Sequence, residues 1–289
     1  MLHVKFPSTT QVIPNLKQLY RRIRPRYGIR SPIIVYQMGK VGSSSLYAGL
    51  RALYLNVPVY QCHMLNNLDA IEESVRQRYP SAPPILSQVE IGRSLRREIE
   101  QKKGTRWNLI SMVREPVARN VSAFFQNLND ILPDARTRLE NNTLNVAWLH
   151  NEFLTRYIHN APADWFDSQM RDVFNIDVFA APFPIERGYQ MYTGPNARLL
   201  VLRYDNLNER ITPAMFEFLG LNNFTLPRAN VTDDKEYRDL YRRFLETPLP
   251  MDYVTQMYET RFAKHFWTDA ERVALIARWT TARAPRSKG

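Results

Sequence analysis

Short apolar runs alternate with amphipathic stretches along much of the chain. Runs of consecutive apolar residues bounded by polar or turn-forming residues predict buried β-strands. They predict four strands, over residues 33–37, 57–61, 107–113 and 198–204. Because helical patterns separate these strands, the order favours an α/β fold with a central parallel sheet and helices on both faces.

The segments after the first three strands repeat apolar residues at the spacing of a helix. The residues that share one helical face are Leu46, Leu50, Leu53 and Tyr54, then Leu68, Ile71 and Val75, and then Val117, Val121, Phe124 and Leu128. Residues 80–84 are interpreted as a proline-rich loop and residues 93–103 as a further helix. A capping box from Thr268 to Glu271 predicts the start of the last helix.

The organisation of the chain follows from its length and from its lack of internal repeats or low-complexity tracts. A chain of 289 residues is long enough for one large core, so we expect a single domain over residues 1–289. Residues 1–30 form a basic lead-in, residues 131–190 an aromatic-rich and poorly periodic insertion, and residues 206–289 a set of C-terminal helices.

The sequence QMGKVGSSSL, residues 37–46, follows the first predicted strand. Gly39 and Gly42 allow a tight turn and a close approach of the backbone to a ligand. The helix that begins here exposes unpaired N–H groups, and Lys40 adds a positive charge. The three serines donate to phosphate oxygens or cap the helix, and we expect at least one of them only to cap it. The loop predicts a phosphate site at a helix N-terminus.

The spacing of this loop differs from that of a Walker A motif. In Walker A the lysine follows the second glycine, whereas here Lys40 precedes Gly42. A nucleotide kinase also needs an aspartate near a strand end to hold magnesium, and only Asp205, far downstream, is suited to that role. A kinase-like enzyme with a degenerate loop stays open as an alternative.

A second anion-binding pattern is VREPVARNVSAFF, residues 113–125. Arg114 ends a strand at the carboxyl edge of the predicted sheet, and Ser122 follows about two turns into the next helix. An arginine beside a helix N-terminus is unfavourable unless an anion lies there. Arg114 and Ser122 are therefore expected to bind a further phosphate together, and Arg119 either assists or is solvated.

The amino-acid composition excludes some kinds of site and favours an anionic binding partner. The single cysteine, Cys62, excludes an internal disulfide framework and a thiolate zinc cluster. The 39 lysines and arginines against 28 aspartates and glutamates give a net charge of +11, which favours an anionic partner. The basic stretch from Tyr20 to Tyr27 could contact RNA or an acidic membrane surface, although a solvated lead-in is the simpler interpretation. The absence of long apolar stretches and of a signal-peptide pattern predicts a cytoplasmic protein without a transmembrane segment.

These motifs resemble those of the sulfotransferases that use 3′-phosphoadenosine 5′-phosphosulfate (PAPS). MGKVGSSSL is similar to the family's 5′-phosphosulfate loop, REPVARNVS to its 3′-phosphate motif, and LLVLRYDNL to its strand that ends in Tyr-Glu-Asp-Leu. The resemblance implies a three-layer, P-loop-like fold and PAPS as co-substrate, with no metal required. It implies cofactor contacts from Gly39, Lys40, Val41, Gly42, Ser43, Ser44, Ser45, Arg114 and Ser122.

The C-terminal half resembles a bacterial family labelled "putative capsular polysaccharide synthesis protein". The resemblance is carried by FPIERGYQMY, by ANVTDDKEYRDLYRRF and by YETRFAKHFWTDAE, which includes His265. The signature of this family is Asn-Lys-Trp-Tyr-Ser, and the corresponding positions, residues 234–238, read Asp-Lys-Glu-Tyr-Arg, which keep only the lysine and the tyrosine. The resemblance implies a carbohydrate or capsular polysaccharide as the acceptor.

Sulfuryl transfer requires a group that stabilises the leaving phosphate oxygen and a base that removes the acceptor proton. Lys40 is the candidate for the first role. His63, which follows the second predicted strand and so lies at the same sheet edge, is the candidate base, and Glu90 is its alternative.

The function expected from the sequence is therefore sulfuryl transfer to a hydroxyl, with a saccharide rather than a nucleic acid as acceptor. Besides a kinase-like enzyme, a non-catalytic protein that binds polyanions stays open, because it would also use the positive charge. Aromatic residues of the insertion either stack on sugar faces or form a helical core, and the core is the favoured interpretation; they are Trp148, Phe153, Tyr157, Trp165 and Phe166.

Overall fold

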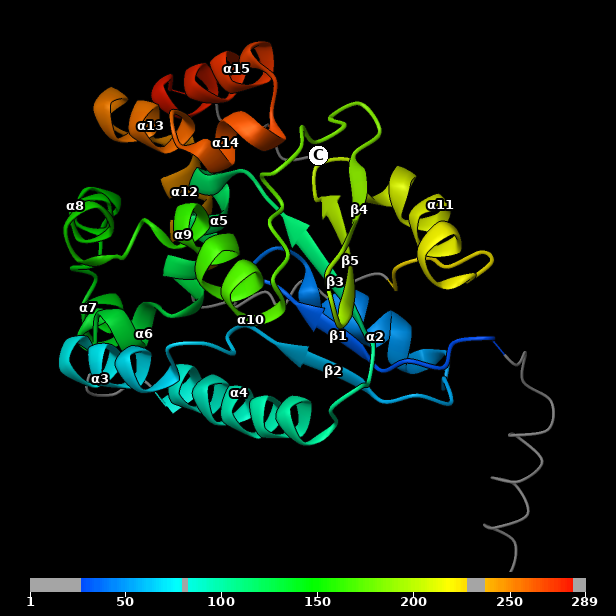
Figure 1. The fold of residues 1–289 in the computed structure, drawn as a ribbon. Helices are drawn as coiled ribbons and strands as arrows, with labels where there is room; N and C mark the ends of the chain where they lie inside the picture. The colour runs from blue at the N-terminus through cyan, green and yellow to red at the C-terminus, as the bar shows by residue number, and fades with distance from the viewer. Residues whose placement is uncertain (1–26, 80–82, 228–236, 283–289) are drawn as a thin grey trace, which may run out of the picture.

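The fold is set by a five-stranded, mostly parallel sheet with the strand order β2-β1-β3-β5-β4 (Figure 1). The computed structural model describes residues 27–79, 83–227 and 237–282. The strands are β1 (Ile33–Tyr36), β2 (Val59–Cys62), β3 (Trp107–Val113), β4 (Tyr189–Thr193) and β5 (Ala197–Arg203). Strands β2, β1, β3 and β5 run parallel, and β4 is antiparallel to β5 at the edge of the sheet.

The four predicted strands are confirmed to within two residues and are parallel, as expected, but the sheet also has a fifth, antiparallel strand that was not predicted. The strand that was missed, β4, has the sequence YQMYT, and only Tyr189 in it is fully buried. An edge strand that is half exposed has no continuous apolar run, so it gives no clear pattern. A tight turn, closed by the hydrogen bond from Gly194 N–H to the Ala197 carbonyl (2.8 Å), joins β4 to β5.

Helices fill the segments between the strands and the C-terminal part of the chain. Those before β4 are α2 (Ser43–Ala52), α3 (Leu68–Arg78), α4 (Pro83–Gln101), α5 (Pro116–Gln126), α6 (Leu128–Ile131), α7 (Ala135–Glu140), α8 (Val146–Arg156), α9 (Ala161–Trp165), the π-helical turn η1 (Phe166–Arg171) and α10 (Asp172–Phe174). Those after β5 are α11 (Leu207–Leu219), α12 (Arg238–Glu246), α13 (Met251–Tyr258), α14 (Arg261–Phe266) and α15 (Asp269–Thr280).

Two helix boundaries differ from those predicted. Helix α4 begins at Pro83, inside the predicted loop 80–84 and ten residues before the predicted start at residue 93. Prolines are tolerated in the first turn of a helix, where the backbone N–H groups have no intrahelical acceptor. Helix α2 ends before Tyr54, which has a positive φ of 50° and is 65% exposed rather than part of the apolar face.

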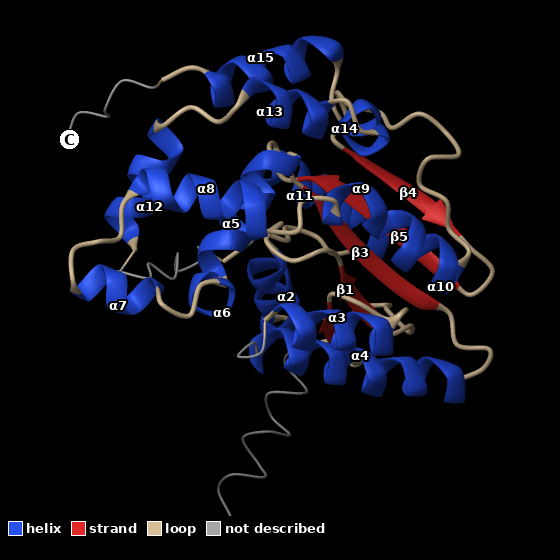
Figure 2. Ribbon diagram, turned by 90° about the vertical axis from the view of Figure 1, so that its left-hand side faces the viewer, coloured by secondary structure: helices blue, strands red, loops and turns tan. Residues whose placement is uncertain are grey.

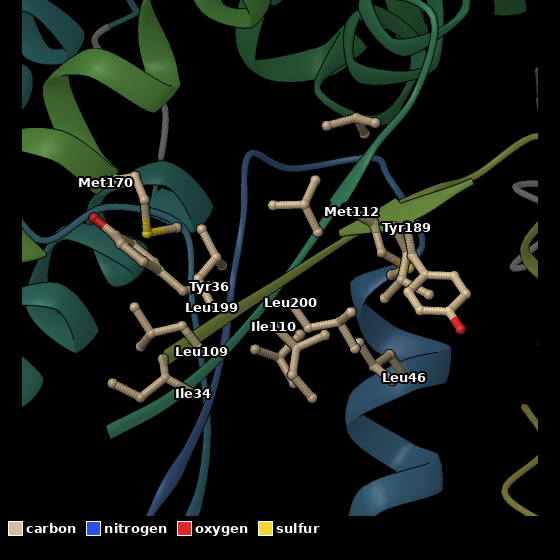
Figure 3. Packing of buried hydrophobic residues seen from close by; sticks show 14 of the residues in the cluster. Ile34, Tyr36, Leu46, Leu109, Ile110, Met112, Met170, Tyr189, Leu199 and Leu200 are labelled. Atoms are coloured by element: carbon tan, nitrogen blue, oxygen red, sulfur yellow. The ribbon is translucent and has the colours of Figure 1, made fainter. Parts of the chain in front are cut away.

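The main core lies on both faces of the sheet. Figure 3 shows that Tyr36 and Leu109 point toward Met170 of η1, whereas Ile110 and Leu200 point toward Leu46 of α2. This alternation is the consequence of the two-residue period of a strand. One face is covered by α4 and the segment from α9 to α10, and the other by α2 and α11 (Figures 1 and 2).

A second apolar cluster is formed by helices beyond the carboxyl edge of the sheet (Figure 1). Phe124 of α5 is its centre, in ring contact with Phe153 of α8 and Phe244 of α12. Of the aromatic residues of the insertion, Phe153, Trp165 and Phe166 are buried, as the core interpretation expected. The insertion is therefore largely a packed helical layer.

Several sequence features fall outside the described residues. They include the basic stretch from position 20 to 26 and positions 234–236 of the capsular-family signature. Within the described part of the chain, none of the helices combines the length and apolarity needed to span a bilayer.

Candidate functional site

The strand order brings three sequence-predicted segments to one edge of the sheet. Lys40 follows β1, His63 follows β2 and Arg114 follows β3. Strand β1 lies between β2 and β3, and all three are parallel. Their carboxyl ends therefore meet at one edge, with the glycine-containing loop in the middle. This is the edge at which open α/β sheets bind ligands.

The loop after β1 is a tight turn that depends on Gly42. Lys40 and Gly42 both have positive φ angles, of 72° and 96°, and Gly42 is the N-cap of α2. A Cβ atom at position 42 would lie 2.9 Å from the ring of Tyr204, which follows β5. The glycine is therefore required both by its backbone conformation and by the close approach of an aromatic side chain.

The serines of the loop do not cap the helix, which corrects the expectation that at least one of them does so. The cap position belongs to Gly42, which has no side chain. The first backbone hydrogen bond of the helix joins Leu46 N–H to the Gly42 carbonyl (3.4 Å), so the N–H groups of residues 43–45 have no acceptor within the helix. Ser44 is exposed, Ser45 is half-buried and Ser43 is buried, while the Val41 side chain lies entirely in the core. Val41 is thus limited to backbone contacts with a ligand.

Two arginines from the second motif brace this loop. Arg114 donates from Nη1 to the Lys40 carbonyl (3.2 Å), and Arg119 donates from Nε to the Gly39 carbonyl (3.1 Å). Arg114 also lies over the Tyr204 ring, with 5.2 Å from Cζ to the ring centre. Arg119 is only 8% exposed, so the solvated alternative is wrong for this residue.

Positive charge accumulates at the loop beside one buried carboxyl group, Glu115, whose pKa is raised by burial and lowered in part by the charge of Arg114. Burial lowers the pKa of Lys40, and the nearby positive charges of Arg114 and Arg119 lower it further. None of these three side chains forms an ion pair with an aspartate or glutamate in the described part of the chain. Because the three cations lie close together and none has a direct ion pair among the described residues, this edge is suited to an anionic ligand.

His63 has one ring nitrogen fixed by the backbone. Its Nδ1 lies 2.9 Å from the Gln37 carbonyl, which can only accept, so Nδ1 carries the proton and Nε2 holds the lone pair. Burial is the main cause that lowers the His63 pKa, and the charges of Arg119 and Lys40 lower it further, whereas the bond to Gln37 raises it. The imidazole is thus neutral near pH 7 and able to accept a proton at Nε2.

The remaining candidates lie in less favourable places. Glu90 lies on α4 with an exposed side chain that pairs with Arg93 (2.6 Å), so nothing links it to the loop. Asp205 accepts from Arg203 (3.1 Å) and from Trp267 Nε1 (2.8 Å). Ser122 is half-buried on α5. His265 packs among the aromatic side chains of Phe179, Phe183 and Phe266.

Residues of the insertion contribute to this edge in a way that the sequence did not indicate. Tyr157 accepts a hydrogen bond from Arg119 Nη1 (2.9 Å), and Trp165 Nε1 donates to the His63 carbonyl (2.8 Å). Gln169 contacts the backbone of the two residues that follow Met64. None of these side chains belongs to a recognisable motif, and only their position in the fold reveals them.

The described residues contain no group of three or more histidine, cysteine, aspartate and glutamate side chains arranged to hold a metal ion. Taken together, the fold and this edge define an α/β protein with a cationic, helix-N-terminal site beside a neutral histidine.

Comparison with known proteins gives one match. The model of a family described as "Putative capsular polysaccharide synthesis protein" matches residues 138–267, just under half of the chain. The match includes Tyr157, Trp165 and Gln169 but not the segment that carries Lys40, His63 and Arg114. No curated protein and no solved structure matches the chain significantly.

Proposed function

We propose that this protein is a sulfotransferase that moves the sulfuryl group of PAPS to a hydroxyl of a carbohydrate. The observation that carries the proposal is the group of three cations, Lys40, Arg114 and Arg119, which form no direct ion pair among the described residues and lie beside a histidine with a free Nε2. Transfer of a sulfuryl group needs mainly positioning, charge stabilisation and one base, and this set of residues provides all three.

The proposed cofactor fits the donors that the site offers. The 5′-phosphosulfate end would be bound by the N–H groups of residues 43–45 and by the ammonium group of Lys40. Within the described residues, these donors have no acceptor that would compete with an anion. Arg114 has guanidinium N–H groups beyond the one that braces the loop, and with Ser122 it would bind the 3′-phosphate. PAPS supplies the activated sulfuryl group.

The chemistry proposed for the protein side chains is limited to charge and proton handling. His63 Nε2 accepts the proton of the acceptor hydroxyl as the oxygen bonds to sulfur. Lys40 stabilises the negative charge that develops on the phosphate oxygen when its bond to sulfur breaks. Arg119 adds to the positive potential and holds the loop through the Gly39 carbonyl.

A saccharide acceptor is supported by the description of the matching family, which names capsular polysaccharide synthesis. The match covers the insertion that lies over the sheet edge and the helices up to Trp267. Trp165 of the insertion contacts the His63 backbone, so an acceptor bound by the insertion would lie near the proposed base.

The nucleotide-kinase alternative has less support. The aspartate that it requires, Asp205, is engaged by Arg203 and Trp267, and the kinase alternative has no further observation in its favour. Binding of a polyanion without catalysis is consistent with the net charge of +11 but gives no role to the fixed tautomer of His63.

Calorimetry with 3′-phosphoadenosine 5′-phosphate (PAP) and with adenosine 5′-phosphate tests the proposal directly. We expect saturable binding of PAP that is about a hundredfold tighter than binding of the monophosphate, because the second ligand leaves Arg114 without its anion. Incubation with ³⁵S-labelled PAPS and a panel of oligosaccharides should then label an acceptor. Equal affinities for the two nucleotides, or turnover of ATP without a sulfate donor, would overturn the proposal.

A further inference from the structure

The backbone that follows His63 is held by one side chain from a distant part of the chain. Gln169 Oε1 accepts hydrogen bonds from Leu65 N–H (2.8 Å), from Asn66 N–H (3.0 Å) and from the Tyr36 hydroxyl (2.8 Å). Its Nε2 donates to the Asn66 carbonyl (3.3 Å). One amide thus ties the loop after β2 to the end of β1.

Neighbouring residues of the same segment complete this clamp. Trp165 donates from Nε1 to the His63 carbonyl, and its ring packs on Tyr36 with 4.9 Å between the ring centres. Asn66 Nδ2 donates to the Ser168 carbonyl (3.0 Å). The loop from His63 to Asn66 is therefore bound to residues 165–169 by a continuous set of hydrogen bonds, which we call the loop clamp.

The local geometry of the clamp is unusual. Gln169 is 4% exposed and lies in η1, a π-helical segment, and such segments occur frequently at functional sites. Leucine or methionine at this position would leave two backbone N–H groups and a tyrosine hydroxyl without their acceptor, at a substantial cost in free energy. A buried amide with this many partners fixes the loop in one conformation.

We propose that Gln169 is a positioning residue for His63: through the backbone of residues 63–66 it keeps Nδ1 of the imidazole on the Gln37 carbonyl and leaves Nε2 free. The catalytic consequence rests on the proposed function, since it matters only if His63 removes the acceptor proton. The structural consequence, a single tautomer in the free protein, does not depend on that function.

The mechanism of the effect is steric and electrostatic. The imidazole is held in a partly buried place beside Lys40 and Arg119, the two charged groups that act on it, and its pKa is lowered there. If the loop loosens, the ring gains water and moves from the Gln37 carbonyl. Both tautomers then become populated, and fewer of the molecules have the base correctly placed.

The test is ¹⁵N NMR of histidine-labelled protein without any ligand, with the His63 signals assigned from a His63→Gln variant. In the unmodified protein we expect one tautomer, with the proton on Nδ1 and a pKa below that of an exposed histidine. Gln169→Met, which removes the amide but keeps the length of the side chain, should give averaged nitrogen signals and a higher His63 pKa. Gln169→Glu keeps an acceptor for the same three donors but loses the donor to the Asn66 carbonyl, so it should restore the single tautomer in part.

A control variant separates positioning from general destabilisation. Thr212→Val removes a hydrogen bond of similar length, from the Thr212 hydroxyl to the Phe224 carbonyl (2.8 Å), far from the clamp, and should leave the His63 signals unchanged. If Gln169→Met fails to fold, Trp165→Phe removes only the Nε1 donor to the His63 carbonyl and should produce the same change in a weaker form. The proposal would be overturned if the tautomer and the pKa of His63 were unchanged in a folded Gln169→Met variant. If that variant does not fold, the same result in Trp165→Phe would overturn it.

Kinetics then connect the clamp to the reaction. In Gln169→Met the rate of transfer should fall by up to about 10²-fold, while PAP binds within about twofold of its normal affinity, because the loop after β1 is untouched. If the histidine signals change but no sulfuryl transfer is found for any variant, the clamp stands and the proposed function fails. If transfer is present and unaffected by the variant, the positioning role fails.

Discussion

The loops at the carboxyl edge of the sheet carry the charged groups of the site, whereas the helical segment from Asn145 to Arg171 holds those groups in place. Lys40, His63 and Arg114 each follow directly on a strand of the sheet. Tyr157, Trp165 and Gln169 reach the same place from helices that are separated from their partners by 38 to 104 positions in sequence.

This difference predicts two kinds of mutational effect. Changes in the loops should remove chemistry or ligand binding with little effect on folding, because Lys40, His63 and Arg114 are only half-buried and the proposed function assigns them to a ligand. Changes in the helical segment and its supports should loosen or destabilise the site first and affect binding only through that loosening. Substitutions in both regions test this division.

Lys40→Ala should have the largest effect, a loss of transfer of about 10³-fold or more, as for other cations that stabilise a transferring group. Its unfolding free energy should be unchanged or slightly higher, because a partly buried cation without an ion-pair partner is removed. Transfer of ³⁵S-sulfate and urea unfolding measure the two effects. Lys102→Ala, which removes an exposed pair with Glu98, is the control and should change neither. Near-normal transfer in Lys40→Ala would remove the loop from the mechanism.

His63→Ala should lower transfer by about 10² to 10⁴-fold with nucleotide binding preserved, as expected for the loss of a general base. The base acts in its neutral form, so activity of the unmodified protein should fall as pH drops through the His63 pKa, which burial and the adjacent cations lower. A pH–rate profile should show this acidic limb, and the variant should lack it.

His150→Ala is the matched control for this comparison. His150 lies in the helical cluster, 4.0 Å from the Phe244 ring centre, and its pKa is also lowered by burial. Its loss should reduce stability without changing the pH–rate profile. An unchanged rate in His63→Ala would mean that another group removes the proton.

Arg114→Ala should erase most of the preference for PAP over adenosine 5′-phosphate, about 3 kcal/mol or roughly a hundredfold in affinity. Ser122→Ala should reduce the same preference less, because only one neutral donor is lost. Calorimetry with both nucleotides gives the ratio for each variant. Arg76→Ala, which removes an exposed pair with Glu72, is the control. If Arg114→Ala weakens both nucleotides equally, the arginine contributes general charge and does not recognise the 3′-phosphate.

Glu115→Gln should lower the free energy of unfolding by about 2 kcal/mol. The buried carboxylate caps α5 through Val117 N–H (3.0 Å) and also accepts from the Tyr258 hydroxyl and from Trp279 Nε1 (3.0 Å). The NH₂ group of the glutamine would face neighbouring groups that all donate hydrogen bonds, so one of them would lose its acceptor. Urea unfolding measures the loss, and PAP affinity at a temperature where the variant is folded should be nearly normal. A stability equal to that of the unmodified protein would show that the helices do not depend on this carboxylate.

Tyr157→Phe should have the smallest effect, about 1 kcal/mol or fivefold weaker binding of PAP. Only one of the two acceptors of Arg119 Nη1 is lost, since Asn120 Oδ1 remains, and the ring stays stacked on Phe153. Calorimetry is again the measurement. Tyr237→Phe removes a hydroxyl bond to Asn129 in the helical cluster (2.6 Å) and should leave PAP affinity unchanged. An effect as large as that of Arg114→Ala would mean that the helical segment contributes to ligand recognition directly.

Elements with a local pattern could be predicted from the amino-acid sequence. The apolar runs predicted β1, β2, β3 and β5, and the run of apolar residues at helical spacing predicted the buried face of α5. Once the strands were taken as parallel, the positions of Lys40, His63 and Arg114 at one edge followed, because residues after parallel strands share an edge. The capping box of α15 was likewise visible, and it is formed.

Features that depend on contacts between distant residues could not be predicted and became visible in the folded structure. Strand β4 gave no pattern, because an edge strand is half exposed, and the N-cap of α2 fell to Gly42 rather than to a serine, because the turn requires a left-handed residue there. The buried position of Arg119, the tautomer of His63 and the clamp formed by Gln169 depend on partners 26 to 104 positions away. No local pattern encodes such pairs, because the side chains meet only after the sheet and the helical segment have packed together.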